Sequence, residues 1–257
     1  FVGVALRGLV HNSFLFIYAS RRKTFAFSRK KIKKIIKGIC KGVEALHGQE
    51  RPIIHLDLNP ANILLDDHME PKIVDFGLSR LFGENQTHTR IANSKSAIEY
   101  MAPEYLQRGQ LSIESDIYSL GLLIIEITTG EKNCSDHELY DTDFTEDKPV
   151  CIYNILRHSF LTQVRECWTA MPYIKSRYSA LSADGHRQVK RSIKIGLSCL
   201  KKKRKDRPTS GDIVKKIDQI GAGSSSVFGK MAVNVETGRG SHFLRIVLWA
   251  DVLLHLM

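Results

Sequence analysis

Apolar residues recur at spacings of three and four along residues 28–48, which places them on one side of a helix. This segment is predicted to form an amphipathic helix, with Ser28 as its N-cap and Gly48 at its end. Its lysines fall largely off the apolar stripe, so we expect them to face solvent. The predicted stripe comprises Ile32, Ile35, Ile36, Ile39, Val43 and Leu46.

The next apolar segments are short. Residues 63–65 and 72–74 are β-prone and are separated by the turn-like sequence DDHMEP, which predicts a β-hairpin. Carboxylate and amide side chains lie at the ends of the two segments. Such groups at the mouth of a hairpin suit metal or phosphate chemistry, and ordinary turn polarity is the alternative interpretation. The side chains concerned are Asp57, Asn59, Asn62 and Asp75.

A continuous apolar run follows at residues 116–130. Apolar residues on all sides predict a buried helix at the centre of a helical domain. Asp116 is expected to cap this helix and Gly130 to end it. Two further amphipathic helices are predicted at residues 186–200 and 209–220.

The remaining segments are predicted to be loops and a tail. Residues 131–149 are acidic and turn-rich, and the GAGSSS sequence at 221–226 is expected to be a flexible linker. The run at 243–257 is too short and too polar for a membrane span, so no transmembrane segment is expected. The chain begins with Phe1, which suggests a fragment or a processed product.

Charge is concentrated in two segments. The net charge is +11; residues 21–41 hold ten basic and no acidic residues, and residues 187–207 hold ten basic and one acidic residue. A hydrophobic content of 43% with 25% charged residues is typical of a globular protein and excludes a disordered, collagen-like or membrane-dominated chain. Both basic segments are interpreted as solvated faces. The alternative for the run KKKRKDR is a nucleic-acid or nuclear-import function, and no specific nucleic acid is expected as a partner.

The five cysteines indicate a reducing compartment. They are odd in number, widely spaced and lack a Cys-x-x-Cys pair, which argues against a disulfide framework or a cysteine zinc site. Cys40 and Cys199 fall on apolar helical positions, where a free thiol behaves as a small hydrophobic group.

Several short motifs, in a fixed order, resemble those of the protein kinase family. The sequence HLDLNPAN, from His55 to Asn62, resembles the kinase catalytic loop, and DFG follows at residues 75–77. APE at residues 102–104, the aspartate at the head of the buried helix and Arg207-Pro208 complete the order expected of a kinase C-terminal lobe. The resemblance covers about residues 26–220 and is closest to plant receptor-like serine/threonine kinases.

This resemblance implies a role for each matching residue. Asp57 would accept the hydroxyl proton of a protein substrate, and Asn62 and Asp75 would bind the Mg²⁺ ions that bridge the phosphates of ATP. Asp116 would accept hydrogen bonds from the catalytic-loop backbone, and Glu104 would pair with Arg207 in a buried ion pair. His55, Phe76 and Gly77 would be structural residues of the catalytic loop and the metal-binding triplet.

The sequence also departs from the family pattern. Asn59 stands where serine/threonine members carry a lysine that contacts the transferred phosphate, and the loss of such a contact typically costs about 3–4 kcal/mol in the transition state. Ala97 and Glu99 replace the usual residues before Tyr100, and Leu56 replaces the usual arginine. No glycine-rich loop and no strand with the nucleotide-binding lysine precede the catalytic loop, so an N-terminal lobe is expected to be absent.

Taken together, the sequence predicts a mainly α, protein-kinase-like C-terminal lobe: a helical bundle whose short β-hairpins carry the catalytic loop and the metal-binding triplet, in a truncated kinase fold. We expect a remnant of the hinge region or an unrelated leader at residues 1–25, the lobe at 26–220, and a linker with an apolar tail at 221–257.

Two functions follow from the resemblance. The first is a serine/threonine kinase of impaired activity that uses ATP and Mg²⁺ on a protein substrate. The second is a catalytically inactive, pseudokinase-like module that interacts with a partner kinase. The expected location is cytoplasmic, including the intracellular part of a plasma-membrane receptor-like kinase.

Overall fold

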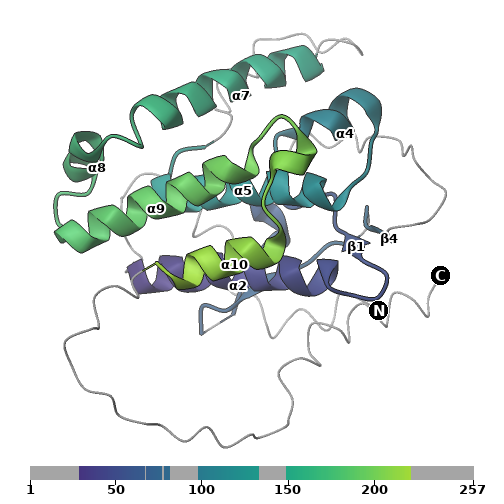
Figure 1. Cartoon of the computed structure of the whole chain (residues 1–257), viewed down its shortest axis with the longest axis horizontal. Coiled ribbons are helices and arrows are strands. Elements are labelled where there is room, and N and C mark those ends of the chain that lie inside the picture. Colours follow the sequence, from purple (N-terminus) through teal and green to yellow (C-terminus); the bar gives the residue numbers. More distant parts are fainter. Residues whose placement is uncertain (1–28, 67, 77, 82–97, 133–148, 221–257) are drawn as a thin grey trace, which may run out of the picture. The chain divides into compact units, whose positions relative to one another are not determined.

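The computed structural model describes residues 29–66, 68–76, 78–81, 98–132 and 149–220. This part of the chain is mainly helical, with two small two-stranded antiparallel sheets, β1 with β4 and β2 with β3 (Figure 1). In chain order the elements are α2 (Arg29–His47), β1 (Ile53–Ile54), η2 (Pro60–Asn62), β2 (Ile63–Leu65), β3 (Pro71–Ile73), β4 (Arg80–Leu81), α4 (Pro103–Arg108), α5 (Ile113–Thr129), α7 (Pro149–Glu166), α8 (Met171–Arg177), α9 (Ala183–Cys199), η3 (Arg204–Asp206) and α10 (Ser210–Asp218).

Helix α5 is buried along most of its length and packs closely on α9. Glycines allow this contact: a Cβ atom on Gly121 would lie 2.6 Å from the Cβ of Cys199, and one on Gly196 would lie 2.7 Å from Cγ1 of Ile125. Such distances are shorter than van der Waals contact, so larger residues would force the two helices apart. The prediction of a buried central helix is confirmed.

Helix α2 buries the predicted apolar stripe and lies beside α10 (Figure 1). Its lysines are less solvated than expected, because three of them contact other elements. The ammonium group of Lys33 donates to the carbonyl of Ile220, and Nζ of Lys37 lies 2.5 Å from Oδ1 of Asp218. These cations lie at the C-terminal end of α10, where the helix dipole favours positive charge. The third lysine, Lys34, lies 2.7 Å from Oε1 of Glu70 in the β2–β3 turn.

The predicted hairpin is present, with one strand displaced by one residue. Strand β3 spans Pro71–Ile73 where residues 72–74 were expected, and Ile63 pairs with Ile73. The side chain of Ile73 and the ring of Pro71 lie against Gly42 and Gly38 of α2, which positions the hairpin on that helix.

The prediction that Asp116 caps the buried helix is wrong. Helix α5 begins at Ile113 with Ser112 in the N-cap position, so Asp116 lies within the first turn. Its carboxylate accepts backbone hydrogen bonds from a distant loop instead. Gly130 does end the helix, as expected, with a left-handed φ of 70°.

The other predicted helices are present with shifted boundaries. Helix α9 begins three residues earlier than expected, because Ser182 caps it by accepting from the N–H of Gly185. Helix α10 begins after Thr209, whose side chain forms a capping box with Asp212. Helices α4, α7 and α8 were not predicted individually.

Several expectations fall outside the described residues, namely the N-cap Ser28, most of the acidic loop, Gly77, the linker and the tail. Both predicted structural thiols are buried, and burial raises the pKa of the Cys199 thiol to about 12. Within the described ranges, no helix combines the length and the apolar character that a membrane crossing requires.

Candidate active site

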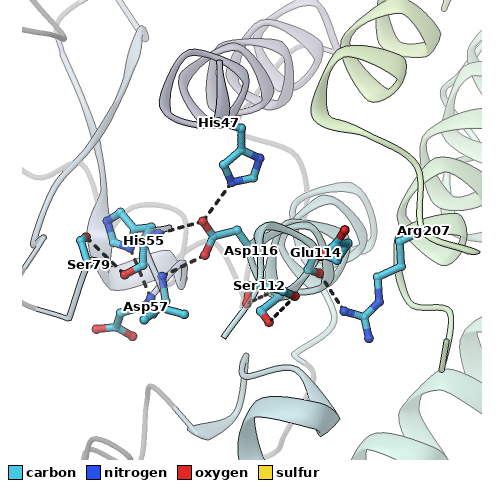
Figure 2. Close-up of polar contacts among 11 residues, drawn as sticks. His47, His55, Asp57, Ser79, Ser112, Glu114, Asp116 and Arg207 are labelled. Atoms are coloured by element: carbon cyan, nitrogen blue, oxygen red, sulfur yellow. Dashed lines mark hydrogen bonds and ion pairs between the residues drawn. The ribbon is translucent and has the colours of Figure 1, made fainter. Parts of the chain in front are cut away.

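A single buried carboxylate organises the loop that follows β1. Oδ2 of Asp116 accepts from the backbone N–H of His55 at 2.8 Å, and Oδ1 accepts from the N–H of Leu56 at 2.9 Å (Figure 2). Nε2 of His47, at the end of α2, lies 3.0 Å from Oδ2 and donates to it, because an ionised carboxylate only accepts. The Asp116 side chain is almost fully buried. It therefore connects α5, α2 and the loop through charge-assisted hydrogen bonds.

These bonds hold Leu56 in an unfavourable backbone conformation. Its φ of 67° is left-handed, which costs a residue other than glycine about 1–3 kcal/mol. Each hydrogen bond to a charged group contributes roughly 1.5–3 kcal/mol, so the two backbone bonds to Asp116 can offset this strain. Asp57 follows this turn directly and is less buried than Leu56.

Two amide side chains hold the carboxylate of Asp57. Nδ2 of Asn59 donates to its Oδ1 at 2.7 Å, and Nδ2 of Asn62 donates to its Oδ2 at 3.0 Å. Oδ1 of Asn59 also accepts from the N–H of Ala61 at 2.7 Å, which caps the short helix η2. Burial raises the pKa of the Asp57 carboxyl, and the two amide donors oppose this by stabilising its charged form.

The β2–β3 hairpin places Asp75 next to Asn62. Ile63 pairs with Ile73, so Asn62 and Val74, one residue beyond this pair, face each other. The N–H of Val74 donates to the carbonyl of Asn62 at 3.0 Å. Asp75 follows directly, with a left-handed φ of 64° and an exposed side chain. Two oxygen-bearing side chains thus lie at one end of the hairpin.

His55 joins the loop to the segment after β3. Its Nε2 lies 3.1 Å from the carbonyl of Val74 and donates to it, and its Nδ1 accepts from the N–H of Asp57 at 3.3 Å. The ring lies 4.8 Å from the ring of Phe76, centroid to centroid, and Oγ of Ser79 donates to the His55 carbonyl at 3.4 Å. Burial lowers the pKa of His55, which favours the neutral imidazole that this pattern requires.

The donor set at the hairpin mouth fits Mg²⁺. Since Nδ2 of Asn62 is committed to Asp57, the amide orientation leaves its carbonyl oxygen for another contact. Mg²⁺ prefers hard oxygen ligands and is usually bound through one or two carboxylates together with substrate phosphates and water. No cluster of three His, Cys, Asp or Glu residues suited to a metal occurs among the described residues.

A second polar cluster ties α4 to the turn before α10. Nη1 and Nη2 of Arg207 donate to the two carboxylate oxygens of Glu104 at 2.6 and 2.8 Å, and Nη1 also donates to the carbonyl of Glu114 at 2.7 Å. Nε donates to the carbonyl of Lys201 at 2.9 Å, and the guanidinium lies 5.0 Å from the ring centroid of Tyr118. The Arg207 side chain is completely buried. It is therefore a structural anchor within an otherwise exposed basic run.

The structure brings most of the predicted site residues into two groups. The first surrounds Asp57 and the hairpin mouth, and the second is the Glu104–Arg207 pair; Asp116 lies in α5, whose first turn borders both (Figure 2). Their chemical roles stay predictions. The first group consists of His55, Asp57, Asn59, Asn62, Asp75 and Phe76.

Sequence reasoning missed two residues. His47 gives no signal beyond its place near the end of an amphipathic helix. Arg157 lies in α7, is 4% exposed, and donates from Nη2 to the carbonyls of Ile98 and Glu99 at 3.1 and 3.0 Å. It thereby fixes the backbone just before Tyr100 and α4. An arginine among apolar residues of an unpredicted helix offered no pattern from which this contact could be inferred.

Comparison of the sequence with known proteins shows which family the chain belongs to. The family model described as "Protein kinase domain" matches residues 7–226. Two similar proteins from Arabidopsis thaliana are cysteine-rich receptor-like protein kinase 24, 41% identical over 181 residues, and cysteine-rich receptor-like protein kinase 18, 36% identical over 182 residues. Each alignment covers 70% of this chain and 26% of the relative.

A third relative from the same plant is a G-type lectin S-receptor-like serine/threonine-protein kinase. It is 35% identical over 185 residues, which are 72% of this chain and 21% of that protein. The chain thus spans about a quarter or less of the length of these curated relatives.

The Arg207 cluster predicts a large loss of stability on a conservative substitution. In Arg207→Lys a single ammonium group replaces the planar fork, leaving Glu104 and two carbonyls without their present donors. We expect the free energy of unfolding in guanidinium chloride to fall by about 3 kcal/mol. The matched control is Arg204→Lys, an exposed arginine of the same turn, which should change it by less than about 0.5 kcal/mol. An equal fall in the free energy of unfolding in the two variants would show that the Glu104–Arg207 pair does not anchor α4 to the turn before α10.

Proposed function

Because this chain belongs to the protein kinase family, we propose that its site binds Mg²⁺–ATP and transfers the γ-phosphoryl group to serine or threonine hydroxyls of a protein substrate, at a reduced rate. The observation that supports this function best is that Asn62 holds the carboxylate of Asp57 and, through the hydrogen bond from the N–H of Val74, lies next to the strand end that leads into Asp75. The Asp57 loop is in turn held by Asp116. Phosphoryl transfer needs positioning and charge neutralisation more than covalent chemistry, and this site provides positioned oxygen groups.

Each residue has a role that its contacts support. Asp57 accepts the proton of the attacking hydroxyl, and the two amides hold its carboxylate in one orientation. The carbonyl oxygen of Asn62 and the carboxylate of Asp75 would hold the Mg²⁺ ion. When bound, Mg²⁺–ATP supplies the phosphoryl group and neutralises the charge on its oxygens. His55 keeps the two halves of the site in register through Val74 and Phe76.

We attribute the proposed reduction in the rate of phosphoryl transfer to Asn59. It lies where the family carries a phosphate-contacting lysine, and its amide is committed to Asp57 and Ala61. A neutral group engaged in this way does not stabilise charge on the transferred phosphoryl group. Removal of one such electrostatic contact lowers rates by about 10²–10³-fold in comparable sites.

A second candidate function is that of a non-catalytic interaction module, which binds a partner kinase. The same observation at Asn59 favours it, because both oxygens of Asp57 already accept from neutral amides. The two functions differ in one respect that can be measured, namely phosphate transfer once the missing charge is restored.

We also propose bounds and a location for the domain. We infer that residues 26–220 form the kinase-like lobe. It would be flanked by a remnant of the hinge region or an unrelated leader at 1–25, and by a linker with a tail at 221–257. The receptor-like kinases that the chain resembles suggest a cytoplasmic location for this lobe, with a protein substrate or a partner kinase as its binding partner.

Mg²⁺–ATP is predicted to stabilise the chain in a metal-dependent way. At a free concentration about one hundred times its Kd, a ligand specific for the native state adds roughly 2.7 kcal/mol. We therefore expect Tm to rise by about 5 °C or more in a thermal-shift titration, and ATP with a chelator to give no rise. Asp75→Ala should abolish the rise, whereas Glu50→Ala, an exposed acidic control, should retain it. A rise that does not need Mg²⁺ would contradict the assignment of Asn62 and Asp75.

Asn59→Lys is predicted to increase phosphate transfer. The new ammonium group supplies the missing positive charge. The rate of phosphate transfer to a generic protein substrate should therefore rise about a hundredfold. The matched control is Asn59→Gln, which changes the length without adding charge and should give no increase. Addition of Asp57→Ala to Asn59→Lys should return the rate to background. If Mg²⁺–ATP binds to Asn59→Lys and no transfer occurs, the interaction module is the correct function.

A further inference from the structure

The two basic segments of the chain differ in how their charges are used. In the first, Lys33, Lys34 and Lys37 of α2 contact α10 and the hairpin turn. In the second, we define a basic face by eight cations of α9 and the turn after it. None of these eight side chains forms an ion pair or a side-chain hydrogen bond within the described ranges of the chain. The face comprises Lys190, Arg191, Lys194, Lys201, Lys202, Lys203, Arg204 and Lys205.

Helical geometry gathers these cations on one side of α9. Positions 190, 191 and 194 fall on the same side of a helix with 3.6 residues per turn, and continuing that period leads to position 201. The opposite side, with Val189, Ile193 and Gly196, is buried against α5 and its neighbours. Arg191, Lys194 and all of residues 201–205 are exposed, and Lys190 is half-buried. The charges therefore project to solvent from the side that does not pack.

The turn that carries five of them is held in a fixed conformation. Its first carbonyl, on Lys201, accepts from Nε of the buried Arg207, and its last part forms the short helix η3. The N–H of Asp206 donates to the carbonyl of Lys203 at 3.1 Å. The backbone is thus tied to the core while the basic side chains remain outside. Asp206 is the only acidic residue among residues 185–207.

From this placement we propose that the basic face is a docking surface for a bilayer rich in anionic phospholipids. Six of its eight cations are lysines, which act as compact point charges, whereas planar, bidentate recognition of a single phosphate favours the arginine fork. Residues 187–207 contain no aromatic side chain on which a base could stack. Clusters of four to eight Lys or Arg residues are attracted to anionic membranes by about 1 kcal/mol per residue near the surface.

The proposed contact is electrostatic and reversible. Lys190, Arg191 and Lys194 lie within about 6 Å along the axis of α9, and the other five cations follow within six residues of its end. At low salt, where screening is weak, they act together on a negatively charged surface. Raising the ionic strength shortens the screening length and should release the chain. This inference does not depend on catalysis, because it is tested without nucleotide.

The test is vesicle flotation of the full 257-residue chain. The chain should float with mixed phosphatidylserine–phosphatidylcholine vesicles at low salt, and should not float with phosphatidylcholine alone. A variant with glutamine at positions 201–205 should bind the mixed vesicles more than about a hundredfold more weakly. Its Tm should be unchanged, since the replaced side chains form no ion pairs.

A control variant with the same change in net charge distinguishes an effect of the basic face from an effect of the overall charge of the chain. It places glutamine at five exposed basic positions elsewhere, and it should bind nearly as well as the unaltered chain. Equal loss in the two variants, or binding that survives in the 201–205 variant, would overturn the proposal. Release of the chain from the vesicles by an equimolar amount of duplex DNA would also overturn the proposal. It would identify the basic face as a nucleic-acid surface instead. The five control positions are Lys31, Lys41, Arg51, Arg165 and Lys175.

Discussion

The carboxylate of Asp116 is the acceptor on which the geometry of the catalytic loop depends. It lies in the first turn of a helix that is buried nearly all round, so its position is set by the core. Donors from His47, His55 and Leu56 converge on its two oxygens. The loop therefore acquires a left-handed residue without glycine, and the residue after it, Asp57, projects toward the hairpin mouth. Without this acceptor, the buried N–H groups of His55 and Leu56 would be unpaired, and nothing would offset the cost of the strained turn.

Sequence reasoning recovered the elements whose signal is local. The stripe on α2 and the all-apolar α5 were predicted because helical spacing and continuous apolarity specify burial directly. The sequence pattern does not predict helices α7 and α8, although Pro149 is the first residue of α7, where proline is favoured, and Pro172 is the second residue of α8. The sequence pattern predicts a cap at Asp116 because aspartate often caps helices. Its real partners are about 60 residues away in the chain, a separation that no local pattern reveals.

For the site, the family resemblance indicates which residues take part but not which contacts they make. Asn59 was recognised as the replacement of a lysine, yet its hydrogen bonds to Asp57 and Ala61 required the structure. They show that the substitution both removes a charge and adds a second amide to the Asp57 carboxylate. The lysines of α2 were expected to be solvated, but Lys33 and Lys37 stabilise the end of α10. Charge composition alone could not separate these paired lysines from the unpaired cations of α9 and its turn.

The measurement that tests the central role of Asp116 most directly is amide hydrogen exchange at His55 and Leu56, resolved by NMR, in the unaltered chain and in Asp116→Asn. In the unaltered chain both amides should exchange slowly, because each donates to a buried carboxylate. In Asp116→Asn their protection should fall steeply, while amides in the middle of α9, such as that of Ile193, stay protected. Equal protection of His55 and Leu56 in the two proteins would contradict the account, because the loop would then hold its shape without the carboxylate.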